Sequence, residues 1–378
     1  MGSLRVALFS GNYNMVRDGA NRALNRLGGH ILASGGALRV YSPTISTPAF
    51  EPTGDLISVP SIAFPGRPEY RLARSLPDRL KQDIRQFQPD LIHVSAPDPL
   101  GFSAQHFARE LGIPVVASLH TRFETYLQHY GLGFVHRLLL RKLDQFYDRA
   151  DLVLVPTEPI RQEFAARGFK RSMVVWGRGI DSSCFHADFR DTGFRQSFGY
   201  RADEIVPLFF GRLVREKGVF QFAEVIARLR QAGLVCRPMI IGDGPERDKL
   251  ARLMPNVNFL GHLSGEALGR AVASADILIN PSQSEAFGNV NLEAMASGLA
   301  VVSADVPSAS QLIDHGRNGL LVAPDDIDAY VAAVLRLVND AALSKAVRGA
   351  AAQAGGQHCW PDVLDVVLNA YRMVLGRS

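Results

Sequence analysis

Short apolar runs alternate along the chain with stretches whose apolar residues recur at helical spacing. Leu4–Phe9, Leu91–Val94 and Leu152–Val155 are typical of these runs, and Pro156 ends the last of them. Short buried runs between helical patterns predict βαβ units with a parallel sheet. The pattern predicts further strands at 114–119, 205–210, 237–241, 257–260, 275–279, 300–303 and 319–322, and helices at 21–27, 219–231, 326–338 and 360–375.

The alternation stops once and then restarts, which indicates two domains. Residues 185–200 are polar and irregular and are the predicted linker. The chain has 378 residues, and single hydrophobic cores stop growing at roughly 250–300 residues. We therefore predict an α/β fold with two doubly wound domains, at 1–184 and 201–359. Ligands of such domains bind at the carboxyl ends of the strands, so functional motifs are expected in the loops that follow strands.

Composition narrows the class of protein. Hydrophobic residues make up 47% of the chain and charged residues 21%, which is ordinary for a globular protein. The three cysteines form no CxxC pair, which argues against a disulfide framework or a zinc site and favours a reducing compartment. The amino terminus does not read as a secretory signal, and no run of about 18 apolar residues is present. We expect a cytoplasmic protein.

The charge differs between the two halves of the chain. Residues 1–190 hold 23 Lys and Arg against 17 Asp and Glu, whereas residues 191–378 hold 18 against 20. A basic first half and a slightly acidic second half indicate different binding partners. The basic residues are not interleaved with stacking aromatic residues, so a nucleic-acid partner is not expected.

The most informative motif follows the predicted strand at 275–279. Seven residues separate two carboxylates, Glu285 and Glu293, and Gly288 with Asn289 suits a turn that starts a helix. The amino end of a helix offers free N–H groups and suits a phosphate. Acceptor carboxylates beside it suit sugar hydroxyls. Taken alone, the two glutamates could equally be solvated residues on a surface helix.

Two further loops follow strands of the second half. The loop after 205–210 carries Arg212 and Lys217, a planar fork and a point charge that could clamp a diphosphate. The loop after 237–241 contains Gly242 and Gly244, where a backbone can approach a ligand closely. Taken alone, the first could be a basic surface turn and the second an ordinary turn.

Other candidates are weaker by themselves. His120 ends the run 114–119, and Gly19 precedes a helix, where its amide could meet a phosphate or a sugar. A lone histidine is more often structural than catalytic. Asp326 and Asp328 form a D-x-D pattern, but they open a helix and are predicted to cap it rather than to bind a metal. We predict no metal site.

Together, these motifs resemble the family 4 retaining glycosyltransferases of the GT-B fold, in which two Rossmann-like domains face each other across a cleft. The resemblance covers nearly the whole chain. It rests on the E-x7-E motif of Glu285 and Glu293 and on segments 18–19, 89–93, 120–121, 178–181, 211–218 and 242–245.

The resemblance implies a role for each matched position. Arg212 and Lys217 would neutralise the donor diphosphate as it leaves, which stabilises charge that develops in the transition state. Glu285 would accept hydrogen bonds from the transferred sugar, and Glu293 from the nucleotide ribose. Gly242, Phe287, Gly288, Asn289 and Val290 would line the donor, His120 would contact the donor sugar near the reacting carbon, and Gly19 would face the phosphate. The family needs no metal cofactor, its reaction is drawn as same-face attack without a protein nucleophile, and its final helix, here about 360–378, commonly packs on the first domain.

Within this family, residues 120–133 and 176–181 resemble a subgroup that acts on lipids. This subgroup includes GDP-mannose-dependent α-mannosyltransferases and UDP-sulfoquinovose:diacylglycerol sulfoquinovosyltransferases. Two positions depart from its pattern, because Ala286 stands where Thr or Ser is frequent and Asn291 where an apolar residue is frequent. Both flank the loop expected to bind the donor sugar, so the donor stays open.

Two basic segments of the first domain suit an anionic membrane surface. Residues 67–85 contain five arginines and Lys81, and 133–143 mixes leucines with Arg137, Arg141 and Lys142. Such stretches can lie in a membrane interface, although 133–143 could equally be a helix with core leucines. We expect peripheral association with the inner face of a membrane.

These observations predict a retaining glycosyltransferase that moves a hexose, expected to be mannose from GDP-mannose, onto a lipid or lipid-linked glycan. Three alternatives remain at this point. A UDP-sugar could be the donor of a glucosyl- or sulfoquinovosyl-type reaction, the protein could be a sugar-nucleotide 2-epimerase, or it could bind a sugar nucleotide without turnover.

Overall fold

The chain divides into two compact units. A computed structural model describes residues 3–16, 19–64, 67–120, 133–201, 203–255, 257–285 and 287–376. Unit 1 comprises Met1–Arg178 and Pro361–Ser378, and unit 2 comprises Gly179–Trp360. The main boundary therefore falls between residues 178 and 179 rather than at 184.

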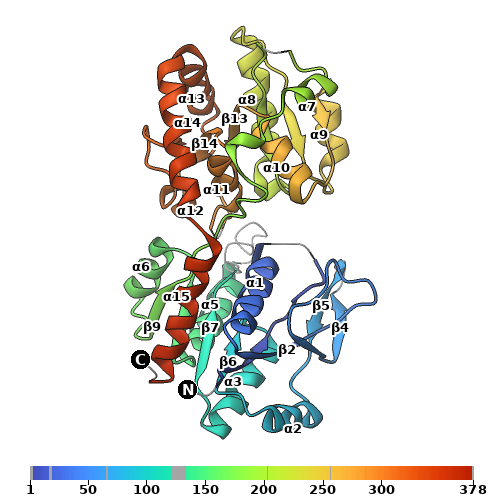
Figure 1. Cartoon of the computed structure of the whole chain (residues 1–378), viewed down its shortest axis with the longest axis vertical. Helices are drawn as coiled ribbons and strands as arrows, with labels where there is room; N and C mark the ends of the chain where they lie inside the picture. Colours follow the sequence, from blue (N-terminus) through green and yellow to red (C-terminus); the bar gives the residue numbers. More distant parts are fainter. Residues whose placement is uncertain are drawn as a thin grey trace. The chain divides into compact units, whose positions relative to one another are not determined.

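Unit 1 is built on a seven-stranded parallel sheet with the order β3-β2-β1-β6-β7-β8-β9 (Figure 1). A separate antiparallel hairpin is formed by β4 (Ser61–Phe64) and β5 (Arg67–Ala73). The remaining strands are β1 (Arg5–Phe9), β2 (Ala37–Ser42), β3 (Asp55–Ser58), β6 (Leu91–Val94), β7 (Val115–Ser118), β8 (Leu152–Val155) and β9 (Ser172–Val175). The helices are α1 (Gly19–Ala33), α2 (Asp78–Phe87), α3 (Pro99–Leu111), α5 (Gly133–Asp148), α6 (Glu158–Ala166) and α15 (Trp360–Val374).

Local sequence explains the central elements of unit 1. Every residue of β6, β7 and β8 is buried, as expected for strands covered on both faces. Helix α3 begins where the Asp98 carboxylate accepts a hydrogen bond from the backbone N–H of Gly101 at 2.7 Å. It ends at Gly112, whose φ of 65° suits a left-handed cap.

Unit 2 is built on a six-stranded parallel sheet with the order β12-β11-β10-β13-β14-β15. The strands are β10 (Pro207–Phe210), β11 (Met239–Ile241), β12 (Asn258–Phe259), β13 (Ile277–Asn280), β14 (Ala300–Ala304) and β15 (Leu320–Val322). The helices are η1 (Ala187–Phe189), α7 (Thr192–Ser197), η2 (Arg215–Lys217), α8 (Val219–Gln231), α9 (Arg247–Leu253), α10 (Gly265–Ala273), α11 (Asn289–Ala296), α12 (Pro307–Ser310), α13 (Ile327–Asn339) and α14 (Ala341–Gly356).

The side chains of this sheet alternate between two hydrophobic cores. Along β10, Leu208 and Phe210 join one core while Phe209 joins the other. Along β11, Met239 and Ile241 join the first core and Ile240 joins the second. Two-sided burial explains why the strands read as continuous apolar runs rather than as alternating ones. The α/β class with parallel sheets predicted from the sequence is confirmed.

The segment 185–200 does not form the predicted linker. It contains η1 and α7 and packs within unit 2. Arg195 is 5% exposed, and its guanidinium bonds the carbonyl of Ser274 at 3.0 Å, the carbonyl of Glu204 at 2.7 Å and the carboxylate of Asp276 at 3.1 Å. A polar segment is thus held by a buried arginine and its hydrogen bonds, which apolar periodicity does not reveal.

The apolar pattern of the sequence did not predict β3, β9 or α14, because few of their residues are large and buried. Strand β3 has exposed ends at Asp55 and Ser58, and the residues of β9 are exposed or half-buried. Each lies at one edge of the sheet of unit 1. Helix α14 is rich in alanine and glycine and buries few large side chains.

The final helix belongs to unit 1, where Figure 1 shows it as the red helix among blue and green elements. Leu364, Val367 and Tyr371 are buried, whereas Trp360 and Val363 are half-buried. At the start of α15, the strand-like segments around Ile180 and Cys359 pair in parallel within unit 2.

Candidate active site

The two most informative loops meet at the point where the strand order of unit 2 reverses. From β10 the chain proceeds outward through β11 and β12, and it then returns to β13 on the other side of β10. The carboxyl ends of such neighbouring strands are the usual ligand site of a doubly wound sheet. The loops after β10 and β13 carry Arg212, Lys217 and Glu285.

An ion pair joins these two loops. The Nζ of Lys217 donates a hydrogen bond to Oε1 of Glu285 at 2.6 Å, and the two side chains are 21% and 17% exposed. Gly218, with φ of 74°, lets the loops approach each other, because a Cβ there would lie 2.7 Å from Cβ of Pro281. The sequence motifs predicted both residues, and the structure shows that they contact each other.

Arg212 lies in the same loop as Lys217. Its guanidinium lies 3.8 Å from the carboxylate of Glu216, and this long ion pair leaves the side chain 46% exposed. Glu216 in turn accepts, at its backbone carbonyl, a 3.3 Å hydrogen bond from the hydroxyl of Ser284. One loop thus carries both Arg212 and Lys217.

The glycine loop after β11 packs against the loop after β10. A Cβ on Gly242 would lie 1.9 Å from the carbonyl oxygen of Gly211, and one on Gly244 would lie 2.4 Å from that of Leu213. The backbone N–H of Leu213 donates to the carbonyl of Asp243 at 2.9 Å. The missing side chains therefore serve the contact between two loops, and contact of Gly242 with a donor stays a prediction.

Helix α11 begins at the end of the loop that carries Glu285. Gly288 has φ of 92° and no described side chain caps this end, so the first N–H groups of Asn289 and Val290 have no partner within the helix. The backbone carbonyl of Phe287 accepts a hydrogen bond from Gln311 at 3.1 Å, and this residue is 6% exposed. Glu293 is half-buried in the second turn. Ala286 lies outside the described residues.

Gly298 closes the carboxyl end of α11. Gly298 has φ of 74°, and its N–H donates to the carbonyl of Met295 at 2.9 Å, while the N–H of Leu299 donates to that of Ala294 at 3.1 Å. These two bonds form a Schellman motif. The helix is therefore fixed at both ends by glycines.

Asn291 anchors this helix from inside unit 2, a contact that the sequence did not predict. Its Oδ1 accepts from the Asn280 amide at 2.8 Å, and its Nδ2 donates to Oγ of Ser303 at 3.1 Å. All three residues are buried. The side chain thus points toward the sheet, where it connects α11 to β13 and β14. The sequence held one sign of this contact. Asn291 is polar at a position where the family resemblance favours an apolar residue.

In unit 1, His120 follows β7. Its Nδ1 accepts a hydrogen bond from Nη2 of Arg178 at 3.0 Å, and its Nε2 lies 2.9 Å from Oγ of Ser118. Burial, the positive charge of Arg178 and the neighbouring His93 hold the pKa of His120 well below its usual range. The ring is therefore neutral near pH 7, and both of its nitrogens are bonded within unit 1. Contact with a donor sugar stays a prediction.

Gly19 is the first residue of α1 and is half-buried. Arg17 and Asp18, which precede it, lie outside the described residues, as do residues 121–132 of the segment that resembles the lipid-acting subgroup. Asp326 caps α13 as predicted, since its carboxylate accepts from the N–H of Ala329 at 2.9 Å. Among the described residues, no group of three or more His, Cys, Asp or Glu side chains is placed to hold a metal ion.

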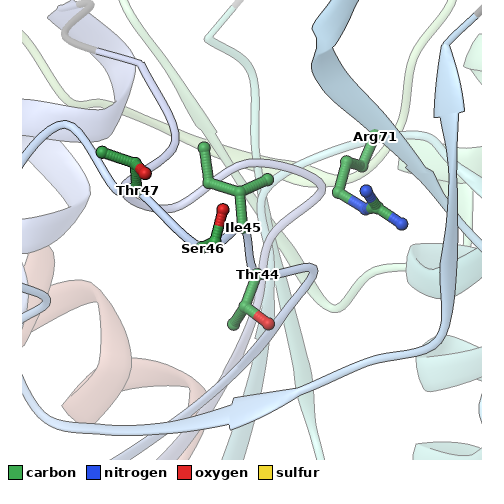
Figure 2. Close-up of a pocket in the computed structure, with 5 residues that line it drawn as sticks. All are labelled: Thr44, Ile45, Ser46, Thr47 and Arg71. Carbon is green, nitrogen blue, oxygen red and sulfur yellow. The ribbon is translucent and has the colours of Figure 1, made fainter.

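Unit 1 also contains a polar cavity of about 610 Å³ beyond the carboxyl end of β2. Figure 2 shows Arg71, on β5, across from the loop 44–47. The Arg71 guanidinium donates to the hydroxyl and the carbonyl of Ser61 at 2.7 and 3.2 Å. The sequence placed Arg71 in a basic segment but gave no sign of a cavity. Its lining consists of Thr44, Ile45, Ser46, Thr47 and Arg71.

The described helices do not include one that is long and apolar enough to cross a membrane. On α5, Arg141 and Lys142 are exposed while Leu143 is buried in the core of unit 1. The described end of this helix therefore keeps one leucine in the core, and the side chains of 133–140 lie outside the description.

Comparison with known proteins agrees with this geometry. A family model described as "Glycosyl transferases group 1" matches residues 204–340, and one described as "Glycosyltransferase Family 4" matches residues 17–183. A GDP-mannose-dependent alpha-mannosyltransferase of Mycolicibacterium smegmatis is 32% identical over 99% of this chain and 98% of its own length. The sulfoquinovosyl transferase SQD2 of Arabidopsis thaliana is 32% identical over 76% of this chain and 58% of its own length.

The solved structures share the fold. Sucrose-phosphate synthase from Thermosynechococcus elongatus matches with a TM-score of 0.80 and 19% identity, covering 99% of this chain and 100% of that one. Anabaena HepE in complex with UDP matches with a TM-score of 0.76 and 18% identity, covering 98% of this chain and 100% of that one.

The fold and these similarities define a nucleotide-sugar-dependent glycosyltransferase of the GT-B class. The chain belongs to glycosyltransferase family 4. The family and the enzyme class predicted from the sequence are thereby confirmed.

Proposed function

We propose that the protein is a retaining mannosyltransferase that uses GDP-mannose and a lipid or lipid-linked glycan acceptor. The observation that carries this proposal is the Lys217–Glu285 pair beside Arg212 and the amino end of α11. Relatives named as GDP-mannose-dependent alpha-mannosyltransferases, including one from Mycobacterium tuberculosis, align over nearly the whole chain. They favour mannose over the alternative sugars.

In this proposal the residues of unit 2 bind the donor and stabilise the leaving diphosphate. The bond between the anomeric carbon and the diphosphate oxygen breaks, and a bond to the acceptor hydroxyl oxygen forms on the same face of the sugar. The acceptor proton passes to the departing diphosphate. Arg212 and Lys217 stabilise the negative charge that grows on that diphosphate.

The carboxylates take a different part. Glu285 holds Lys217 in place and accepts hydrogen bonds from the mannose hydroxyls, and Glu293 accepts them from the ribose. The free N–H groups at the start of α11 add a positive dipole end toward the phosphates. Phe287 holds this loop in the core through its buried ring.

We assign acceptor binding to unit 1. The hydroxyls of Thr44, Ser46 and Thr47 and the guanidinium of Arg71 suit a polyol or an anionic group. An Arg71→Met variant is expected to raise the KM for the acceptor and leave the KM for the donor unchanged. Equal changes in both constants would contradict this assignment.

The proposed membrane contact also involves unit 1. Ile62 and Leu72 lie opposite each other on the β4–β5 hairpin and are 45% and 39% exposed. Arg74, Arg79 and Arg85 nearby in the sequence are exposed as well. Apolar and basic exposure of this kind suits peripheral binding to an anionic membrane from the cytoplasmic side. Sedimentation with anionic and with neutral vesicles tests it, and equal binding to both would refute the electrostatic part.

Thermal-shift measurements with GDP and with UDP test the donor without an acceptor. A ligand at about 100 times its Kd adds about 2.7 kcal/mol. A shift with GDP that disappears in Lys217→Ala supports mannosyl transfer, whereas a shift with UDP alone favours a glucosyl- or sulfoquinovosyl-type donor. No shift with either nucleotide would contradict the proposed donor binding.

Turnover assays separate the remaining alternatives. Conversion of the sugar nucleotide without acceptor would indicate a 2-epimerase, and nucleotide binding without any turnover would indicate a non-catalytic protein. The transferase is expected to stay active after treatment with EDTA, since the family resemblance implies a metal-independent reaction. Loss of activity that Mg²⁺ or Mn²⁺ restores would refute that point.

A further inference from the structure

A continuous chain of hydrogen bonds crosses the interior of unit 1 and ends at His120. It begins at Tyr371 on α15, whose hydroxyl lies 2.5 Å from Nδ1 of His93, and His93 Nε2 lies 2.7 Å from Oγ of Ser118. Ser118 then contacts Nε2 of His120 at 2.9 Å, and Arg178 bonds Nδ1 of His120 at 3.0 Å. Four elements contribute, namely α15, β6, β7 and the segment after β9.

The direction of these bonds follows from Arg178. A guanidinium can only donate, so Nδ1 of His120 must present a lone pair. A neutral imidazole then carries its proton on Nε2, which donates to Ser118 Oγ. Among the described residues Ser118 Oγ has one remaining partner, His93 Nε2, so its own proton points there. His93 in turn donates from Nδ1 to Tyr371.

Packing also fixes the orientation of the His120 and His93 rings. The ring of Trp176 meets His120 edge-on at 5.0 Å between centroids and His93 at 6.1 Å. Trp176, His93, Ser118 and Tyr371 are each at most 1% exposed. The Arg178 guanidinium is held in turn by the carbonyls of Trp176 and Gly177 at 3.3 and 2.9 Å.

We infer that Arg178 and Ser118 are positioning residues of the transferase, which hold His120 in one orientation and in the neutral Nε2–H tautomer, and that Tyr371 extends this control to α15. This inference rests on the proposed function, because His120 is the residue expected near the donor sugar. A neutral ring cannot act as a cation toward the leaving diphosphate, so His120 contributes by shape and orientation.

Arg178 and α15 both lie where the chain passes between the two units. Arg178 is the last residue of unit 1 before the chain enters unit 2, and α15 starts where the chain returns. The orientation of His120 therefore depends on both segments that connect the units. A change in either connecting segment is expected to alter the His120 ring.

Nuclear magnetic resonance of the histidine rings tests the geometry without any substrate. Long-range ¹H–¹⁵N spectra of ¹⁵N-histidine protein, assigned with His120→Gln, should show the neutral Nε2–H form of His120 from pH 5.5 to 8. Among the described residues, the charged and titratable groups that act on this ring are Arg178 and His93, and His93 in turn contacts Tyr371. In Arg178→Met the cation and its N–H donors are both removed, so Nδ1 of His120 no longer has to accept a hydrogen bond. The pKa of the ring should then rise toward its ordinary value of about 6.5, while burial still holds it below that value.

Kinetics then test the role in turnover. Arg178→Met is expected to lower kcat at least tenfold and to give kcat/KM a new acidic limb, with the KM for the donor and the thermal shift by GDP unchanged. Arg178→Lys, which keeps a donor and the charge, should recover part of kcat. Tyr371→Phe should reduce kcat severalfold, whereas the matched controls Tyr41→Phe and Arg109→Met in the same unit should not.

Each outcome decides the inference. A His120 ring that titrates normally in the wild type, or that keeps its tautomer in Arg178→Met, would overturn the assigned geometry. A displaced tautomer with unchanged kcat would overturn the positioning role. If the wild type transfers no sugar at all, the proposed function fails, and the spectra still decide whether Arg178 controls the ring.

Discussion

The ion pair between Lys217 and Glu285 allows stability and catalysis to be separated in one experiment. Removing one partner of a fully buried pair costs about 3–5 kcal/mol, whereas exposed pairs contribute about 1 kcal/mol or less. Because the two side chains are 21% and 17% exposed, we expect Lys217→Met and Glu285→Gln each to lower the free energy of unfolding of unit 2 by about 2 kcal/mol. For a unit of this size that corresponds to about 4–8 °C in Tm.

The double variant should behave differently from the sum of the single ones. With both charges gone, no unpaired carboxylate or ammonium is left in the loop, so most of the lost stability should return. Activity should not return, because the proposed donor contacts of both residues are missing. Urea unfolding and thermal shifts measure the first quantity, and kcat/KM with GDP-mannose measures the second.

Two results would refute this reasoning. Additive losses of stability would show that the pair is not coupled, despite the 2.6 Å distance. A kcat/KM near the wild-type value in Lys217→Met would show that the donor diphosphate is not stabilised by this residue. A useful control is Arg228→Met, since Arg228 forms exposed ion pairs on α8 within the same unit.

Three further predictions follow from particular contacts. Asn291→Leu removes two buried hydrogen bonds and leaves the Asn280 amide without the acceptor it has now, so it should destabilise unit 2 by about 1–3 kcal/mol in urea unfolding; an unchanged midpoint would contradict this. Gly288→Ala, at φ of 92°, should cost about 1–2 kcal/mol and raise the KM for the donor, whereas Gly298→Ala at the other end of α11 should lower stability alone. Burial lowers the pKa of His93 to about 3, so the unfolded chain takes up a proton near pH 6.5 that the folded chain refuses. Stability should therefore fall by about 2 kcal/mol between pH 7 and pH 5 through this group, and His93→Gln should lose that part of the slope.

Much of the architecture could be predicted from the order of apolar runs. The strands β6 and β8 and the helix α8 have the predicted bounds. The strands are buried on both faces and consist of apolar runs, and the helix is buried along one stripe of apolar residues, so residue types alone predict them. Edge strands such as β3 and the polar segment around Arg195 could not be predicted in this way. Their stability comes from neighbours that lie far away in the sequence.

The candidate site also combines features that the sequence predicts with contacts that only the structure shows. The sequence by itself proposed Lys217, Glu285 and His120 as candidates, because charged or polar residues in the loops after buried strands are expected at the carboxyl edge of a sheet. It could not show that Lys217 pairs with Glu285, since they lie 68 positions apart in the chain and the strand order brings their loops together. It also could not show that both nitrogens of His120 are already occupied.

Residue type thus determined which groups are available, and tertiary structure decided which of them face each other. Hydrophobic periodicity is a local property that survives in any window of the chain, whereas hydrogen bonds such as Tyr371 to His93 join positions 278 residues apart. Such contacts depend on register and strand order, which the whole fold sets at once. For this protein the family could be predicted from local motifs, and the electrostatics of its candidate site came from the packing of distant segments.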